Sequence, residues 1–216
     1  MSQSVDEYRS MTLARIKEFK HAAFGKTTIE CSLNDFNYQL LLLTSECGND
    51  RQLMDLIGKW RKENEIWYLS QFPVTVERTI KWFNDKLIET PDRLLFIIKT
   101  DKGYIGHLGL FRFDFNRKNC EIDNILRGEP EYPGIIGNAI INMMKWGRDY
   151  LKLGGYSLKV LSDNERAIRL YKSLCFKEIK RIPLIQVQGK DGLEWIEAPD
   201  GYDKEARKYY VVMEVI

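Results

Sequence analysis

Residues 161–176 read LSDNERAIRLYKSLCF, and this stretch predicts the end of a strand followed at once by a short helix. Ser162 and Glu165 have the spacing of a capping box, so the helix is expected to begin near Asp163 or Asn164. Asn164 and Tyr171 are separated by nearly two helical turns, and their side chains therefore face the same way. The apolar part of this face consists of Ala167, Leu170 and Leu174.

The phenol of Tyr171 suggests acid catalysis on this face. A phenol with a pKa of about 10 can donate its proton to a departing thiolate, whose thiol has a pKa of about 8.5 by analogy with cysteine. The alternative is a half-buried packing residue whose hydroxyl contacts water, because tyrosines are common on amphipathic helices. The spacing by itself leaves both interpretations open.

A loop rich in glycine and proline, RGEPEYPG at 127–134, precedes a second helical pattern, IIGNAIINMMKWGRDYLK. The free backbone N–H groups and the positive dipole end of a helix start can bind phosphate, and Gly134 and Gly137 leave room for an anion. Glycine and proline are also ordinary residues of a loop before a helix. Neither GxGxxG nor GxxxxGK(S/T) occurs, which disfavours dinucleotide-binding and P-loop proteins.

Taken together, ILRGEPEYPGIIGNAI and LSDNERAIRLYKSLCF resemble the GCN5-related N-acetyltransferase (GNAT) family. The most specific part, NERAIRLYKSLCF, is similar to the family's N-x-x-A-x-x-x-Y-x-x-x-G-F signature. The resemblance covers residues 38–216, which it implies form the acetyltransferase domain, with 1–37 as a helical and hairpin extension. It also implies a mixed α/β (α+β) fold, in which helices flank both faces of a mostly antiparallel sheet, and acetyl-CoA as the cofactor.

The resemblance further implies the roles of individual residues. The backbone before and at the start of the second helix would bind the pyrophosphate of coenzyme A, Asn164 would contact the pantetheine arm, and Tyr171 would protonate the thiolate. The expected cofactor-binding residues are Leu126, Arg127, Gly134, Ile135, Ile136, Gly137, Asn138, Ala139, Asn164 and Tyr171.

The sequence departs from the family pattern in two places. The family's R/Q-x-x-G-x-G/A loop falls on Tyr132, Ile135 and Gly137, so only its last glycine is kept, and Gly134 is expected to compensate. Cys175 stands where the family usually has glycine, and a left-handed turn there would cost about 1 kcal/mol. We interpret Cys175 as a small buried residue rather than a nucleophile, because no histidine lies near it in sequence.

Several residues are candidates for the base that takes a proton from the acceptor amine, with Asp123 and His107 ranked first. Alternation places Glu121 and Asp123 on one strand face, and Glu129 follows in the loop. His107 lies on the preceding strand, and a histidine has an unperturbed pKa of about 6.5. The alternatives are solvated carboxylates and a core histidine whose hydrogen bonds are satisfied.

The rest of the chain predicts the remaining elements. Helices are expected at 4–19, 51–63 and 76–89, and strands at 27–33, 36–44, 93–100, 104–113, 120–126, 156–161, 176–187 and 208–216. A long polar insertion at 189–207, with turns at KDG and PDG, separates the last two strands. Its Trp195 and Tyr202 suit stacking on a sugar or a nucleobase, or else form a surface loop.

The composition is that of one soluble globular chain. It has 216 residues, 44% of them hydrophobic and 30% charged, and a net charge of +2 that favours neither nucleic acid nor an anionic membrane as a partner. The four cysteines lack any CxxC pairing, which disfavours a metal site and fits reduced thiols in the cytoplasm. No apolar leader or membrane span is predicted, so we expect a cytoplasmic protein.

We predict an acetyl-CoA-dependent N-acetyltransferase that works by direct attack of a primary amine of a small molecule. The RGEPEYPG and RIPL segments are similar to bacterial enzymes that modify nucleotide-linked amino sugars, which implies such an acceptor; its diphosphate could be met by Arg112, Arg117 and Lys118. The alternatives are a protein or peptide N-acetyltransferase and a non-catalytic acyl-CoA-binding module. The N-terminal helix is a candidate docking segment for a partner or for a homodimer.

Overall fold

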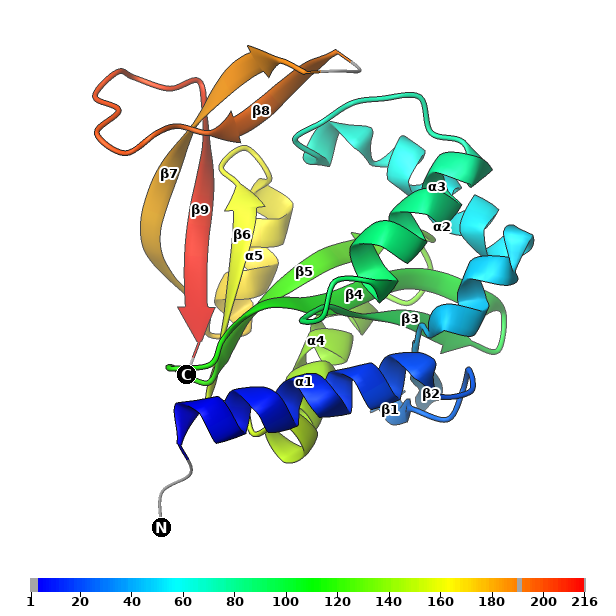
Figure 1. Ribbon diagram of the computed structural model, residues 1–216. Coiled ribbons are helices and arrows are strands. Elements are labelled where there is room, and N and C mark those ends of the chain that lie inside the picture. The colour runs from blue at the N-terminus through cyan, green and yellow to red at the C-terminus, as the bar shows by residue number, and fades with distance from the viewer. Residues whose placement is uncertain (1–3, 190–191, 216) are drawn as a thin grey trace.

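The computed structural model describes residues 4–189 and 192–215, which form one sheet with helices on both faces (Figure 1). Within these residues nine strands follow the order β1-β2-β3-β4-β5-β6-β9-β7-β8. The strands are β1 (Thr28–Leu33), β2 (Phe36–Leu42), β3 (Leu94–Thr100), β4 (Gly103–Asp114), β5 (Asn119–Arg127), β6 (Gly155–Leu161), β7 (Lys177–Gln188), β8 (Leu193–Glu197) and β9 (Lys208–Val215). Every pairing is antiparallel except that of β5 with β6, which confirms the predicted mixed, mostly antiparallel fold.

The helices are α1 (Val5–His21), α2 (Arg51–Glu63), α3 (Val76–Trp82), α4 (Ile135–Leu151) and α5 (Glu165–Ser173). Shorter turns are η1 (Ser45–Asn49), η2 (Glu65–Trp67) and the π-helical η3 (Phe83–Ile88), which continues α3. The helices predicted at 4–19, 51–63 and 76–89 are therefore present, as are those that begin near residues 135 and 165.

The sheet is buried on both faces, and β3 shows this directly. Leu94, Phe96 and Ile98 belong to one core cluster, which also contains residues of α1, α4 and α5. Leu95 and Ile97 point the other way, into a second cluster with α2 and η3. A strand covered on both sides has an uninterrupted apolar sequence, as LLFII has at 94–98.

Helix α1 packs against its own chain. Its predicted capping box is present: the hydroxyl of Ser4 accepts from the N–H of Glu7 (3.2 Å), and the Glu7 carboxylate accepts from the N–H of Ser4 (3.0 Å). Ile16 lies in the same core cluster as α4, and the buried Tyr8 donates to the carbonyl of Leu151 (2.9 Å). The predicted division after residue 37 falls inside β2, which pairs with β1 on one side and with β3 on the other.

The segment 189–207 contains more structure than the predicted polar insertion. Its residues Leu193–Glu197 form β8, which pairs antiparallel with β7 and extends the sheet. The sequence LEWIE was read as loop because it is short and lies between glycine turns, whereas the long β7 supplies the partner edge that lets it pair. Lys190 and Asp191 of the expected KDG turn, and Ile216 of the closing strand, lie outside the described residues.

No helix in the described part of the chain is long and apolar enough to cross a membrane. The four cysteines are free thiols; Cys31, Cys47 and Cys120 are buried, whereas Cys175 is exposed.

Candidate functional site

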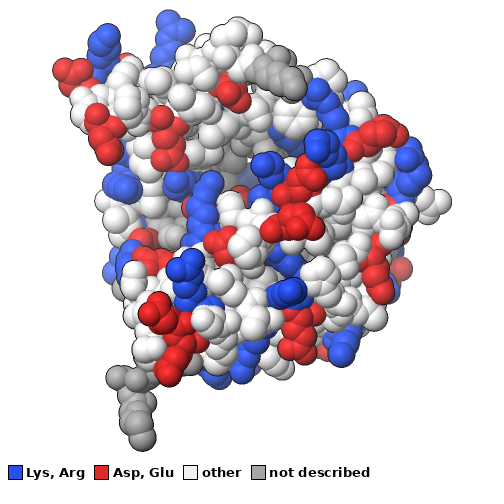
Figure 2. All heavy atoms as spheres, viewed as in Figure 1, with Lys and Arg blue, Asp and Glu red and all other residues white. Residues whose placement is uncertain are grey.

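The site is an opening between β5 and β6. These parallel strands pair only where residues 119–121 meet residues 155–157. Beyond that point β6 pairs with β9, and β5 continues beside β4, so the C-terminal ends of β5 and β6 separate (Figure 1). A cavity of about 980 Å³ lies at this separation, lined by both strands, the starts of α4 and α5, and the segment from α2 to α3. Figure 2 shows the surface hollowed there, with side chains of both charges around it.

A β-bulge shapes the cavity wall contributed by β5. The register between β4 and β5 shifts between His107 and Gly109, and Asn124 has a left-handed φ of 51°. The bulge turns the backbone of residues 123–126 along the cavity. The carbonyl of Asn124 accepts a hydrogen bond from Nδ1 of His107 (2.7 Å), which fixes the bulge to β4.

The start of α4 forms the floor of the cavity. Gly134 is the N-cap residue, and its φ of 85° is the left-handed conformation that glycine adopts at little cost. Tyr132 before it is also left-handed (φ 61°), and this loop is held by a ring stack on Phe36 (centroids 4.3 Å apart) and by a hydrogen bond from the Tyr132 phenol to Asp101 (2.8 Å). The first-turn N–H groups of a helix lack acceptors within it, so this end of α4 can bind an anion.

The predicted cofactor residues lie mostly on this cavity, with two exceptions. Those that line it are Leu126, Arg127, Gly134, Ile135, Ile136, Gly137, Asn164 and Tyr171. Asn138 instead accepts a hydrogen bond from the phenol of Tyr38 (2.5 Å), and Ala139 is fully buried in the core. Gly137 has a packing role as well, because a Cβ there would lie 3.2 Å from Leu170 on α5.

Asn164 caps α5 itself, which corrects the expected capping box. Its side-chain oxygen accepts from the N–H of Ala167 (3.2 Å), whereas the Ser162 hydroxyl accepts from the N–H of Tyr209 and so ties α5 to β9. The Ser162–Glu165 spacing is therefore a coincidence of sequence, since Asn164 is an equally good cap two residues nearer the helix. The amide nitrogen of Asn164 is left to serve the cavity.

Tyr171 is buried at the inner end of the cavity, on the same face of α5 as Asn164. Burial raises the pKa of its phenol, so the group stays protonated at neutral pH. Phe176 contacts the ring edge to face (centroids 6.2 Å apart) and fixes its position. A protonated phenol held this way can donate a proton to a group inside the cavity.

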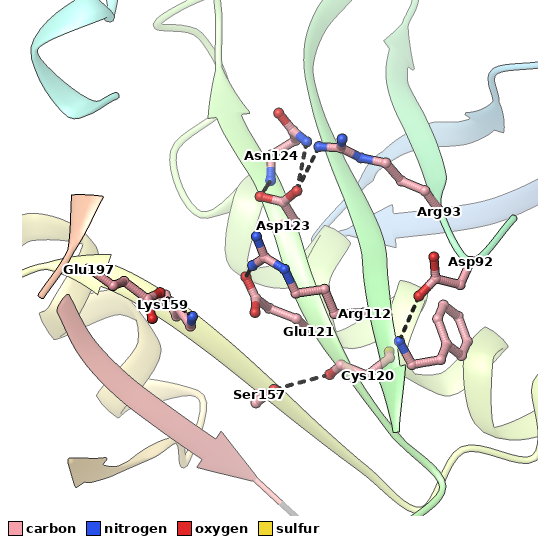
Figure 3. Close-up of polar contacts among 11 residues, drawn as sticks. Asp92, Arg93, Arg112, Cys120, Glu121, Asp123, Asn124, Ser157, Lys159 and Glu197 are labelled. Atoms are coloured by element: carbon pink, nitrogen blue, oxygen red, sulfur yellow. Dashed lines mark hydrogen bonds and ion pairs between the residues drawn. The ribbon is translucent and has the colours of Figure 1, made fainter. Parts of the chain in front are cut away.

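The two first-ranked base candidates both line the cavity, in different states. His107 is buried, and burial lowers its pKa to about 4, so the imidazole is neutral at pH 7. Because Nδ1 donates to Asn124, Nε2 keeps the lone pair. Asp123 is an ion-pair partner of Arg93 (2.8 Å), and it also accepts from the N–H and the side-chain amide of Asn124 (2.7 and 3.0 Å; Figure 3).

The other two carboxylates are held by neighbouring groups. Glu121 pairs with Arg112 (2.7 Å; Figure 3) and lies outside the cavity lining. Glu129 lines the cavity and accepts from the indole N–H of Trp60 (2.9 Å). Cys175, expected to be buried, is exposed, although its φ of 67° is the left-handed turn predicted where the family has glycine. It is exposed because it follows the last turn of α5, while the next residue returns to the core.

The aromatic wall of the cavity comes from a segment that the sequence analysis left unassigned. Trp195 and Tyr202 of the insertion are not among the lining residues; Trp195 instead lies under Nζ of Lys208 (5.6 Å from the ring centroid). Besides Tyr132 and Tyr171, the aromatic residues that line the cavity are Trp67, Tyr68, Phe72, Trp82 and Tyr210. Three of them belong to EIWYLSQF, whose density of aromatic residues between two helices was the available signal.

The basic residues expected to meet a diphosphate are also placed elsewhere. Arg112 pairs with Glu121, Arg117 pairs with Glu214 (3.0 Å), and Lys118 lies over the ring of Tyr8. These three lie outside the lining because they sit at or near the β4–β5 turn, at the opposite end of β5 from the bulge. The basic residues that line the cavity are Arg61, Arg78, Arg93, Arg127, Lys159 and Arg166.

Comparison with known proteins agrees with this geometry. A family model described as "Acetyltransferase (GNAT) domain" matches residues 47–177. Among solved structures, spermidine N-acetyltransferase from Vibrio cholerae, in complex with CoA and spermine, is 16% identical, with a TM-score of 0.60 over 82% of this chain and 94% of that one. The ribosomal L7/L12 α-N-protein acetyltransferase RimL is 13% identical, with a TM-score of 0.63 over 88% of this chain and 95% of that one. No curated protein matches the chain significantly in sequence.

Proposed function

The chain belongs to the GNAT acetyltransferase family, whose cofactor is acetyl-CoA, and from this premise we propose that it acetylates a primary amine of a small molecule. The observation that carries the proposal is the cavity at the separation of β5 and β6, which Tyr171, Asn164 and the start of α4 all line. The cavity also continues past β5 to the aromatic segment between α2 and α3, which leaves space for an acceptor.

The residues fit acetyl-CoA on observations of the cavity itself. The left-handed Gly134 opens the start of α4, whose N–H groups suit the pyrophosphate, and a Cβ there would meet nothing closer than 3.8 Å. The separated edge of β5 and the amide of Asn164, which line the same cavity, would bind the pantetheine arm. When bound, acetyl-CoA supplies the acetyl group as a thioester.

Two groups of the chain would act on the transfer. Backbone N–H groups near the end of β5, beside the bulge, hold the developing negative charge on the carbonyl oxygen. The phenol of Tyr171 donates its proton to the leaving sulfur. Burial raises the pKa of this phenol, so the proton is still present at neutral pH. Because the phenol is 7% exposed, bulk water has little access to this proton.

The amine must lose a proton to attack, and His107 is the better placed of the two base candidates. Its Nε2 lone pair is unoccupied by the bond to Asn124, whereas the Asp123 carboxylate already accepts from Arg93 and Asn124. With a pKa of about 4 the imidazole is a weak base, so it orients the amine and a water, and the proton of the amine passes through that water to the solvent.

Contacts between the β7–β8 hairpin and the segment between α2 and α3 favour a small acceptor over a protein terminus. Ser70 forms a β-bridge with Glu194, and the N–H of Trp195 donates to the carbonyl of Leu69 (2.8 Å). The β7–β8 hairpin therefore touches the aromatic segment across the cavity, where a polypeptide would need an open groove. The nucleotide-linked amino sugar remains a prediction for the acceptor, and a homodimer remains one for the assembly.

The direct test is release of coenzyme A from acetyl-CoA over a panel of amines, with Tyr171→Phe beside the wild type. We expect the substitution to lower kcat about a hundredfold or more while acetyl-CoA affinity, measured by calorimetry, stays the same. Tyr150→Phe is the matched control, because Tyr150 is an exposed tyrosine of α4, and it should retain full activity. Full activity in Tyr171→Phe would remove the acid, and acetyl-CoA binding without turnover would favour the non-catalytic module. Preferential turnover of peptide N-termini would favour the protein N-acetyltransferase.

A further inference from the structure

One half of the cavity is proposed to hold the acceptor. Some of the charged side chains there form ion pairs, and one arginine does not. We define the acceptor half as Arg61, Tyr68, Phe72, Trp82 and Arg93, all of which line the cavity. These residues come from α2, from the segment between α2 and α3, from the end of α3, and from the residue before β3. They lie across β5 from the start of α4, where the cofactor is placed.

The acidic residues of the cavity near this half have partners. Asp123 is neutralised by Arg93, whose guanidinium also stacks on Phe111 (4.5 Å to the ring centroid). Glu129 accepts from Trp60, and Glu129 and Glu63 lie 3.7 and 3.8 Å from the ammonium of Lys59. Carboxylates compensated in this way offer little to an acceptor that carries several positive charges.

Arg61 has no ion-pair partner in the described part of the chain, although the negative charge of Glu65 partly offsets the lowering of its pKa by burial. Its guanidinium lies over the rings of Tyr68 (3.9 Å) and Phe72 (4.5 Å), and Nη2 donates to the carbonyl of Ser70 (2.8 Å). Among the described residues no carboxylate lies within ion-pair distance of it, and the buried Nη1 has no acceptor. A buried charged donor without an acceptor is unfavourable and uncommon in folded proteins.

We propose that the acceptor amine carries an anionic group, a carboxylate or a phosphate, and that Arg61 pairs with it. This inference rests on the proposed function and names its class of substrate. A guanidinium offers a planar fork of donors that matches both kinds of anion. Because Nη1 is buried, the anion reaches it by displacing the segment 68–72, which the bonds from Arg61 and Trp195 hold.

The pairing also predicts which acceptors are poor. An amine with only positive charges, such as the spermidine in the name of a structural neighbour, would bring no anion to Arg61. It would also lie near Arg93, and the carboxylate of Asp123 is already engaged in an ion pair with that arginine. The anion-bearing acceptor therefore distinguishes this chain from a polyamine acetyltransferase.

The experiment compares amines in matched pairs that differ in the anionic group. The probes are phosphoethanolamine with ethanolamine, γ-aminobutyrate with its amide, a nucleoside-diphosphate-linked amino sugar with the free amino sugar, and spermidine. The initial rate of coenzyme A release gives kcat and KM for each. We expect the anionic member of at least one pair to have a kcat/KM about ten- to a hundredfold higher, and the pair that responds separates phosphate from carboxylate.

Arg61→Gln should remove this preference, because it should raise KM for the anionic member far more than for the neutral member. Arg61→Lys, which keeps the charge without the planar fork, should retain part of it. Arg112→Gln is the matched control, because Arg112 pairs with Glu121 outside the cavity, and it should keep the full preference. Acetyl-CoA affinity and the thermal midpoint, measured for each variant, separate a lost contact from a lost fold.

Distinct results would overturn the inference and the proposed function. Turnover that favours spermidine or the neutral members, or an anionic preference that survives in Arg61→Gln, removes the inference and leaves the acetyltransferase intact. An equal loss for both members of every pair in Arg61→Gln would mean that Arg61 only clamps the aromatic segment, which also overturns the inference. Wild-type protein that binds acetyl-CoA and turns over no amine refutes the proposed function itself.

Discussion

At the residue scale, Cys175 shows how a single backbone angle can cost stability without touching the chemistry. It follows the C-cap of α5 with a φ of 67°, and its N–H donates to the carbonyl of Lys172 (3.1 Å). This is the left-handed position at which helices usually end on glycine, because a Cβ there meets the neighbouring carbonyl. The thiol is exposed, so its burial offers little to offset the strain.

Cys175→Gly should therefore stabilise the protein by about 1 kcal/mol, the strain that glycine relieves less the entropy it adds to the unfolded chain. Chemical denaturation followed by circular dichroism measures the change. Cys175→Ala is the matched control, because it removes the thiol and keeps the Cβ, and it should leave the stability unchanged. An equal gain in both variants would assign the effect to the thiol rather than to the backbone.

At the element scale, a buried lysine joins α1 to the end of the π-helical turn η3. Lys20 is 2% exposed, and its ammonium donates to the carbonyls of Leu87 (2.7 Å), Ile88 (3.1 Å) and Thr90. These carbonyls end the π-helical turn η3, where acceptors lack partners within the helix. Burial lowers the pKa of Lys20 to about 8, so the side chain is still charged at neutral pH and below.

Lys20→Met should destabilise the protein by about 3 kcal/mol, because methionine fills the space and leaves the buried carbonyls without a donor. The free energy of unfolding is best measured at pH 6.5, where the lysine is protonated in both the folded and the unfolded state. Lys17→Met changes an exposed lysine of the same helix and should stay within about 0.5 kcal/mol of the wild type. Similar losses in the two variants would mean that charge on α1, and not this contact, matters.

Elements with a strong local signal were predictable, and those that depend on a distant partner were not. The α1 capping box and the apolar run of β3 each occupy a short stretch of sequence, and both are present as predicted. Strand β8 was missed because it forms only where β7 offers an edge. The Ser162 cap was wrong because two capping residues compete within a few positions, and hydrogen-bond geometry selects Asn164.

At the scale of the whole molecule, the cavity was likewise predictable only where its residues carry a local sequence signal. Tyr171, Asn164 and His107 were found from sequence, because each lies in a local motif or has a distinctive side chain. The aromatic segment and Arg61 reach the same cavity from about a hundred residues earlier in the chain, and only the separation of β5 from β6 brings them there. Such proximity depends on strand order and register, which one sequence does not reveal.

The fold also predicts that α1 is part of the core rather than an appendage, which the removal of residues 1–24 would test. Burial of Tyr8 and Ile16 contributes about 1.5–3 kcal/mol each, and with the Lys20 bonds the sum approaches the 5–15 kcal/mol that holds a typical domain together. We expect the shortened chain to lose its cooperative thermal transition and its affinity for acetyl-CoA. Val5→Ser, on the exposed face of the same helix, should unfold like the wild type. A sharp transition and unchanged acetyl-CoA affinity in the shortened chain would instead make the N-terminal segment a separable extension, as the division after residue 37 predicts.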